Sequence, residues 1–292
     1  MFRIETKRRT RLTAALEMCE VTYHATVRSA RGNQSNALFG LMMNVVFIGL
    51  FILTLYITMT IMGMKSNQFR GDFVLFLMTG VMSYMTYNKT MRAVYGAEGP
   101  TSAMMMHAPM NTIVAIASAA LSALYTQMFA VIVVLFIYHV GFKPLEIANP
   151  SFALFMMLSA WIFGISTGLV LMAIKPWAPK LAPIMMLIVA RVNIFASGKM
   201  VVGNALSFSL LKFFDWNPLF HVIDQMRGAI FLNYSPRNSN VPYIYEVSFA
   251  LFVLGMMGEF FSRRHVSKSW FAPICDRPPA STTMVPISLL MG

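Results

Sequence analysis

Six long apolar blocks dominate the sequence, and polar or proline-containing connectors separate them. They cover residues 37–64, 73–87, 110–138, 152–174, 181–202 and 247–261. Hydrophobic residues make up 57% of the chain and charged residues only 12%, against about a quarter in an average soluble domain. A soluble fold of 292 residues would need one implausibly large core to bury these blocks. The pattern therefore predicts an all-α integral membrane protein with six transmembrane helices, the second of which extends into residues 88–90.

The segment before the first block is polar and basic. It carries apolar side chains at spacings of four, three, four and four residues, which trace one face of a helix: Leu12, Leu16, Cys19, Tyr23 and Val27. This pattern is typical of a helix that lies on a membrane surface. We expect three parts in the chain: an amphipathic interface segment (1–36), a six-span domain (37–262) and a poorly ordered tail (263–292).

The net charge of +12 is distributed in short clusters that flank the apolar blocks, with the largest cluster before the first block. Such a distribution follows the positive-inside rule and places both termini in the cytoplasm. Because the basic residues form no single face with interleaved aromatics, we expect no nucleic-acid partner. Cys19 and Cys275 then lie in a reducing compartment, and two cysteines make no disulfide framework.

The apolar blocks lack the groups that coupled transport or catalysis needs. No carboxylate lies within the first five blocks, and Glu246 and Glu259 lie only at the two ends of the sixth. The chain also lacks a G-x-x-x-x-G-K-[ST] phosphate-binding loop, so uphill transport would need energy from a partner. The histidines show no metal-binding spacing. His221 and Asp224 lie one turn apart, either as polar residues on a partly exposed helix or as a catalytic dyad.

Arg191 is the strongest single candidate for a functional residue, because it is a charged residue inside the fifth apolar block. At 1.5 Å per residue it is roughly 16 Å from Lys180, near the middle of a membrane. A charge at that depth needs water, a partner or the bundle interior. Two interpretations stay open: a channel-lining cation, or an internal hydrogen-bond donor to backbone carbonyls or Asn193.

The loop between the fifth and sixth blocks, residues 203–246, is rich in aromatic side chains. Asn217 and Pro218 predict the start of a short helix, since proline suits the first helical position. Its apolar face would comprise Leu219, Val222, Ile223, Met226 and Ile230. The aromatic residues are typical of a belt at a membrane surface, and rings also stack on sugars.

A buried arginine, a Ser-Gly break, an Asn-Pro turn, a short helix and a final span follow one another in residues 191–261. This order resembles the transmembrane subunits of type-2 ABC exporters that move capsular polysaccharide or O-antigen. The resemblance implies short re-entrant outer helices before the last span and a pore between two copies of the chain. It also implies that one group of residues forms the substrate channel and gate: Arg191, Phe195, Ser197, Gly198, Trp216, Asn217, Pro218, His221 and Arg227.

The same resemblance implies a bacterial inner-membrane location and a separate ATP-binding ABC subunit, which would hold ATP and Mg. This chain would bind no cofactor or metal and catalyse nothing itself. The loop between the second and third spans would couple to the ATPase through Gly99, Pro100, Thr101, Ser102 and His107. A lipid-linked polysaccharide would be the substrate, and periplasmic export components are further expected partners.

Two alternatives stay open. One is a related ABC exporter of drugs, lipids or peptides, which would share the six spans but need not share the aromatic pore or the outer gate helices. The other is a membrane-bound glycan-modifying enzyme that uses His221 and Asp224.

Overall fold

The computed structural model describes residues 11–31, 37–63, 72–97 and 112–270 of the chain. All regular secondary structure in these ranges is helical, which confirms the all-α prediction. The helices are α1 (Arg11–Arg31), α2 (Ala37–Ile61), α3 (Phe73–Gly96), α5 (Thr112–Gly141), α6 (Pro150–Ile174), α7 (Ala182–Ala196), the 3-10 turn η1 (Gly203–Ala205), α8 (Phe208–Asp215), α9 (Pro218–Ile230) and α10 (Val241–Trp270).

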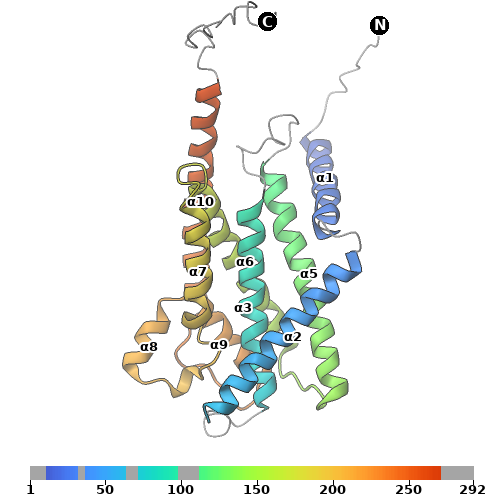
Figure 1. The fold of residues 1–292 in the computed structure, drawn as a ribbon, viewed down its shortest axis with the longest axis vertical. Coiled ribbons are helices and arrows are strands. Elements are labelled where there is room, and N and C mark those ends of the chain that lie inside the picture. The colour runs from blue at the N-terminus through green and yellow to red at the C-terminus, as the bar shows by residue number, and fades with distance from the viewer. Residues whose placement is uncertain (1–10, 32–36, 64–71, 98–111, 271–292) are drawn as a thin grey trace, which may run out of the picture.

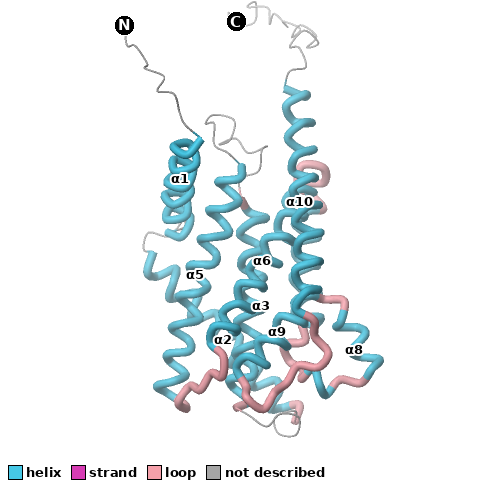
Figure 2. The backbone as a smooth tube through the Cα atoms, turned by 180° about the vertical axis from the view of Figure 1, so that it is seen from behind, coloured by secondary structure: helices cyan, strands magenta, loops and turns pink. Residues whose placement is uncertain are grey.

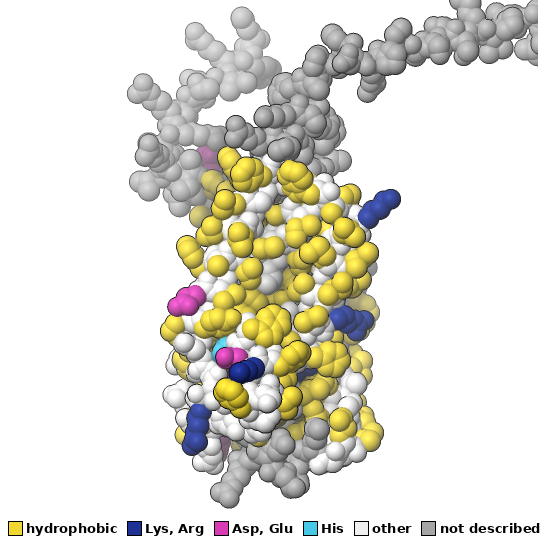
Figure 3. Space-filling view, turned by 90° about the vertical axis from the view of Figure 1, so that its left-hand side faces the viewer, with side chains coloured by type: hydrophobic (Ala, Val, Ile, Leu, Met, Phe, Trp, Pro, Cys, Tyr) yellow, Lys and Arg dark blue, Asp and Glu magenta, His cyan; other side chains and the backbone are white. Residues whose placement is uncertain are grey.

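Four helices are long and apolar enough to cross a membrane. They comprise Phe39–Ile61 of α2, all of α5 and α6, and Val241–Ser262 of α10. Hydrophobic side chains cover most of the molecular face in Figure 3. These features indicate a membrane-embedded protein. Helix α7 is apolar but has only 15 residues, and α3 is not among the four.

Three predicted blocks differ from the helices in their boundaries. Helix α3 continues past residue 90 to Gly96, because its polar second half is packed inside the bundle. The fifth block was expected to reach residue 202, but α7 ends at Ala196. Gly198 has a φ of +64°, a left-handed conformation that ends a helix. The sixth helix begins at Val241, well before the predicted start.

The helices form an elongated bundle with α3 and α6 at its centre (Figure 1). Helix α10 packs on α6, while α2 and α5 pack on α3, and α1 lies against α5. Helix α1 and the C-terminal end of α10 lie at one end of the bundle, and α8 and α9 lie at the other (Figures 1 and 2). We call the end that holds α8 and α9 the outer end, following the predicted orientation.

Glycines allow the central helices to approach closely. A Cβ atom on Gly168 of α6 would lie 2.8 Å from the carbonyl oxygen of Met91 and 2.8 Å from Cβ of Val94, both in α3. On α10, a Cβ on Gly255 would lie 2.7 Å from Cβ of Leu169. Such small-residue contacts are how helices pack where lipid removes the hydrophobic driving force. The close packing of α3, α6 and α10 therefore depends on having glycine, and no larger residue, at positions 168 and 255.

We predict that Gly168→Val separates α3 from α6 and destabilises the protein by about 1–3 kcal/mol, the usual cost of overpacking. The measurement is the thermal unfolding midpoint in detergent. Gly49→Val is the matched control, because a Cβ at Gly49 of α2 has no neighbour within 4 Å. Equal midpoints for the two variants would contradict the close approach.

Candidate functional site

Helix α9 is buried inside the outer end of the bundle. Eleven of its residues are buried, and they include the polar residues His221, Asp224 and Arg227. It packs against α3, α6 and α10. The predicted apolar face is buried, and the polar residues on the other faces of the helix are buried as well. The polar side chains enter the interior because each finds a partner there, as the following contacts show.

Asn217 confirms the predicted helix start and also joins α9 to the bundle. Its side-chain oxygen accepts a hydrogen bond from the backbone N–H of Leu219 (3.0 Å), which caps α9 with Pro218 in the first turn. Its amide nitrogen donates to Asn193 Oδ1 of α7 (2.8 Å). Asn193 in turn donates to the Tyr87 hydroxyl of α3 (3.1 Å). This chain of bonds links α9, α7 and α3 across the interior.

Arg227 holds the turn that follows α7, residues 197–202, which we call the post-α7 turn. The guanidinium is 1% exposed and donates to the carbonyl oxygens of Val201 (2.6 Å), Lys199 (2.5 Å) and Gly198 (3.4 Å). Its Cζ lies 3.8 Å from the centre of the Phe76 ring of α3. The Gly198 carbonyl also accepts from the backbone N–H of Val201 (3.1 Å), whereas Arg227 supplies to the Lys199 and Val201 carbonyls the hydrogen bonds that water would otherwise give.

Gly198 fits tightly against α9. A Cβ at this position would lie 2.6 Å from the Phe220 ring, and the positive φ already disfavours other residues. Ser197 beside it is fully buried. The predicted Ser-Gly break is therefore the point where α7 stops and the chain turns into the bundle.

His221 and Asp224 face different partners. His221 accepts from the backbone N–H of Asn240 through Nδ1 (3.1 Å), so Nε2 donates to the carbonyl oxygen of Asp215 (2.7 Å). Asp224 instead accepts a hydrogen bond from the Tyr234 hydroxyl. Both residues are buried, which corrects the expectation of a partly exposed helix. Neither contact couples His221 to Asp224, so the geometry gives the dyad hypothesis no support.

Burial shifts the acid–base properties of this cluster. It lowers the pKa of Arg227 to about 10, while Tyr234 and Asp224 act in the opposite direction. Arg227 therefore stays charged at neutral pH. Burial and the neighbouring Asp224 raise the pKa of Tyr234. The Tyr234 hydroxyl thus remains a donor to Asp224.

Three of the predicted channel residues lie apart from this buried group. Phe195 is 72% exposed, Trp216 is 55% exposed, and Arg191 is also exposed, on an α7 whose outward residues are mostly apolar. The interpretation of Arg191 as an internal partner of Asn193 gains no support, because Asn193 bonds to Tyr87, Asn217 and its own helix. Helix α8 has no buried residue and stands away from the bundle (Figure 2).

Lys199 is a site residue that the sequence reasoning did not single out. Its side chain is 1% exposed, and its Nζ lies 3.9 Å from the centre of the Tyr84 ring and 4.5 Å from that of Phe51. Within the described residues, Nζ has no hydrogen-bond partner. The sequence feature that could have identified it is a single lysine directly after a Ser-Gly pair in an apolar block.

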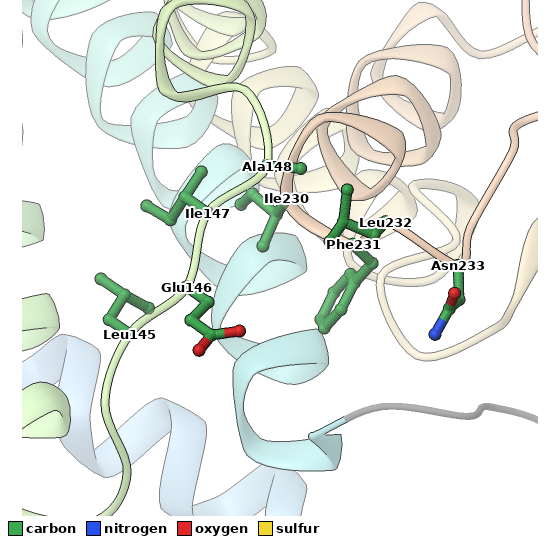
Figure 4. Close-up of a pocket in the computed structure, with 8 residues that line it drawn as sticks. All are labelled: Leu145, Glu146, Ile147, Ala148, Ile230, Phe231, Leu232 and Asn233. Carbon is green, nitrogen blue, oxygen red and sulfur yellow. The ribbon is translucent and has the colours of Figure 1, made fainter.

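A surface pocket of about 510 Å³ lies between the α5–α6 connector and the end of α9 (Figure 4). Apolar side chains line most of it, with Glu146 and Asn233 as the polar exceptions. None of the predicted channel residues lines this pocket. The predicted coupling residues Gly99, Pro100, Thr101, Ser102 and His107 lie outside the described residues. Among the described residues, no three His, Cys, Asp or Glu side chains gather as a metal site would require.

Comparison with known proteins found no matching family model and no matching curated protein. The candidate site therefore rests on its own geometry.

We predict that Arg227→Met unfolds the outer end, because the Lys199 and Val201 carbonyls lose their donor and the Gly198 carbonyl keeps only the Val201 N–H. Breaking a buried charged contact costs about 3–5 kcal/mol. Thermal unfolding in detergent measures the loss. Arg237→Met is the matched control, since the Arg237 side chain is exposed. A similar small shift in both variants would refute the role of Arg227.

Proposed function

We propose that this chain is the membrane subunit of an ATP-driven exporter that moves a lipid-linked cell-surface polysaccharide across the bacterial inner membrane. Capsular polysaccharide is the first choice of substrate and O-antigen the second. The observation that carries the proposal is the buried outer end: α9 and the post-α7 turn plug the bundle, while α7 presents Arg191 and Phe195 outward.

The plug has the features of a gate. An apolar face of α9 packs in the core, and a few buried polar contacts, above all those of Arg227 and Asn217, join α9 to the post-α7 turn and to α7. Polar contacts can be exchanged for water when a path opens, with a small net change in free energy. Trp216 and Phe213 lie exposed beside the plug and offer ring faces to a sugar.

The six-span count is part of this proposal. Helix α3 crosses as the central helix, and neighbours cover it so well that it needs less apolar surface than a lipid-facing span. Helix α7 crosses as a short span that ends at Ala196, and the post-α7 turn lies at the outer end of the bundle. Helix α1 packs beside α5 at the proposed cytoplasmic end, so that both termini are cytoplasmic.

The proposed exporter is a homodimer. Helix α7 exposes apolar side chains at several positions, including Ile184, Ile188 and Val192, and only its inner side contacts the rest of the chain, mainly α3 and α6. Arg191 on this helix needs water or a polar partner at membrane depth. A second copy supplies both when two α7 helices line a hydrated path between them.

The first test is co-purification in detergent with candidate ATPase subunits from the same organism. We expect a complex with two copies of each chain and ATP hydrolysis that falls when residues 99–110 are altered. If no candidate ATPase binds the folded chain, the exporter proposal is wrong.

Within that complex, we predict that Arg191→Ala lowers polysaccharide export into vesicles by about tenfold, the loss of one charge-assisted hydrogen bond. ATP hydrolysis should persist, because Arg191 lies about 14 Å along α7 from its first residue, Ala182, at the proposed cytoplasmic end. Arg237→Ala is the control for loss of an exposed outer charge. Unchanged export in Arg191→Ala would show that Arg191 does not line the channel.

A further inference from the structure

Lys199 lies in an aromatic cage, and no acid of the described residues pairs with it. Phe51 of α2 and Tyr84 of α3 stack with their ring centres 6.2 Å apart, and the Lys199 amine lies against both rings. The backbone of Lys199 comes so close to α3 that a Cβ on Gly80 would lie 2.9 Å from its carbonyl oxygen. The side chain thus fastens the post-α7 turn to α2 and α3.

The surroundings of the cage disfavour an ammonium ion. Tyr84 of α3 is the titratable group in contact with the amine, and Arg92 of α3 and Arg191 of α7 act electrostatically on Tyr84. Arg227 of α9 donates to the Lys199 carbonyl, which adds a positive charge nearby, and Asp224 and Tyr234, bonded to each other, lie beside Arg227. The two rings offset only part of the cost of removing a cation from water. Among the described residues no acid pairs with the amine and no group accepts its hydrogen bonds, so the neutral form fits the cage better.

We propose that the post-α7 turn separates from α2 and α3 with the uptake of one proton by Lys199. In the closed arrangement the amine is neutral and packs as an apolar group between Phe51 and Tyr84. In the open arrangement water solvates Nζ, which binds a proton and becomes an exposed cation at the outer end. Opening of the outer end is therefore coupled to pH, a property that goes beyond the proposed export function.

The direction of the pH effect follows from the two arrangements. Burial lowers the pKa of Lys199, which lies outside the helices, to about 7, while a solvated lysine has a pKa of about 10.4. Between these values the open arrangement binds more protons than the closed one. Lowering the pH from about 10 to about 7 therefore favours opening, and the effect levels off below about pH 7.

The test measures how fast a thiol beside the cage reacts from the outside. Ser197 is fully buried, and Ser197→Cys is a small change; Cys19→Ser and Cys275→Ser remove the native thiols. The chain alone in phosphatidylcholine vesicles is treated with a membrane-impermeant methanethiosulfonate reagent between pH 7 and pH 9.5. Rates are divided by those of the same reporter in Lys199→Met, which cancels the titration of the thiol itself.

We expect this ratio to rise by about fivefold or more as the pH falls from 9 to 7. Lys199→Arg keeps its charge at every pH, so its reporter should react fast throughout. The variant Ser209→Cys, at an exposed position of α8, checks that reagent access is equal in all variants. A flat ratio, or a faster reaction in Lys199→Met than in the native lysine at pH 9, would overturn the proposal. Because no ATPase is present, this result stands apart from the test of export.

Discussion

A guanidinium removed from water must find its hydrogen bonds within the protein, and Arg227 finds them on the three carbonyls that follow α7. The rest of the outer end depends on this contact. It holds the turn that begins at Gly198, whose positive φ ends α7. It also draws α9 into the bundle, since the arginine can reach those carbonyls only from inside. The Asn217–Asn193–Tyr87 bonds then fix the angle at which α9 enters.

Much of the fold follows from the order of apolar and polar residues. The apolar blocks predict the long helices, and Asn217-Pro218 predicts the start of α9, because both signals are local. Boundaries such as Gly96 and Val241 depend instead on packing. A polar half-helix survives in α3 because its neighbours cover it. The sequence of residues 88–96 alone does not indicate that neighbouring helices bury this part of α3.

The candidate site was predictable in its residues but not in their arrangement. Ser197, Gly198, Asn217, Pro218, His221 and Arg227 do come together, whereas Arg191, Phe195 and Trp216 stay on the exterior of a single chain. The helical spacing of α9 shows which residues share a face, but not that every face is buried. Lys199 escaped notice because its partners, Phe51 and Tyr84, lie on two other helices. A contact between a basic residue and aromatic residues that are distant in the sequence produces no periodic sequence pattern.

The length of α7 has a consequence for the path proposed between two copies of the chain. Its 15 residues rise about 22 Å, whereas a hydrocarbon core is about 30 Å thick. At Gly198 the chain turns back into the bundle, so α7 does not continue in the same direction. In the proposed homodimer, two facing α7 helices would therefore form a wall about 8 Å shorter than the core. The polar end of an amphiphile that follows this wall would meet headgroups and water earlier than it would beside a full-length span.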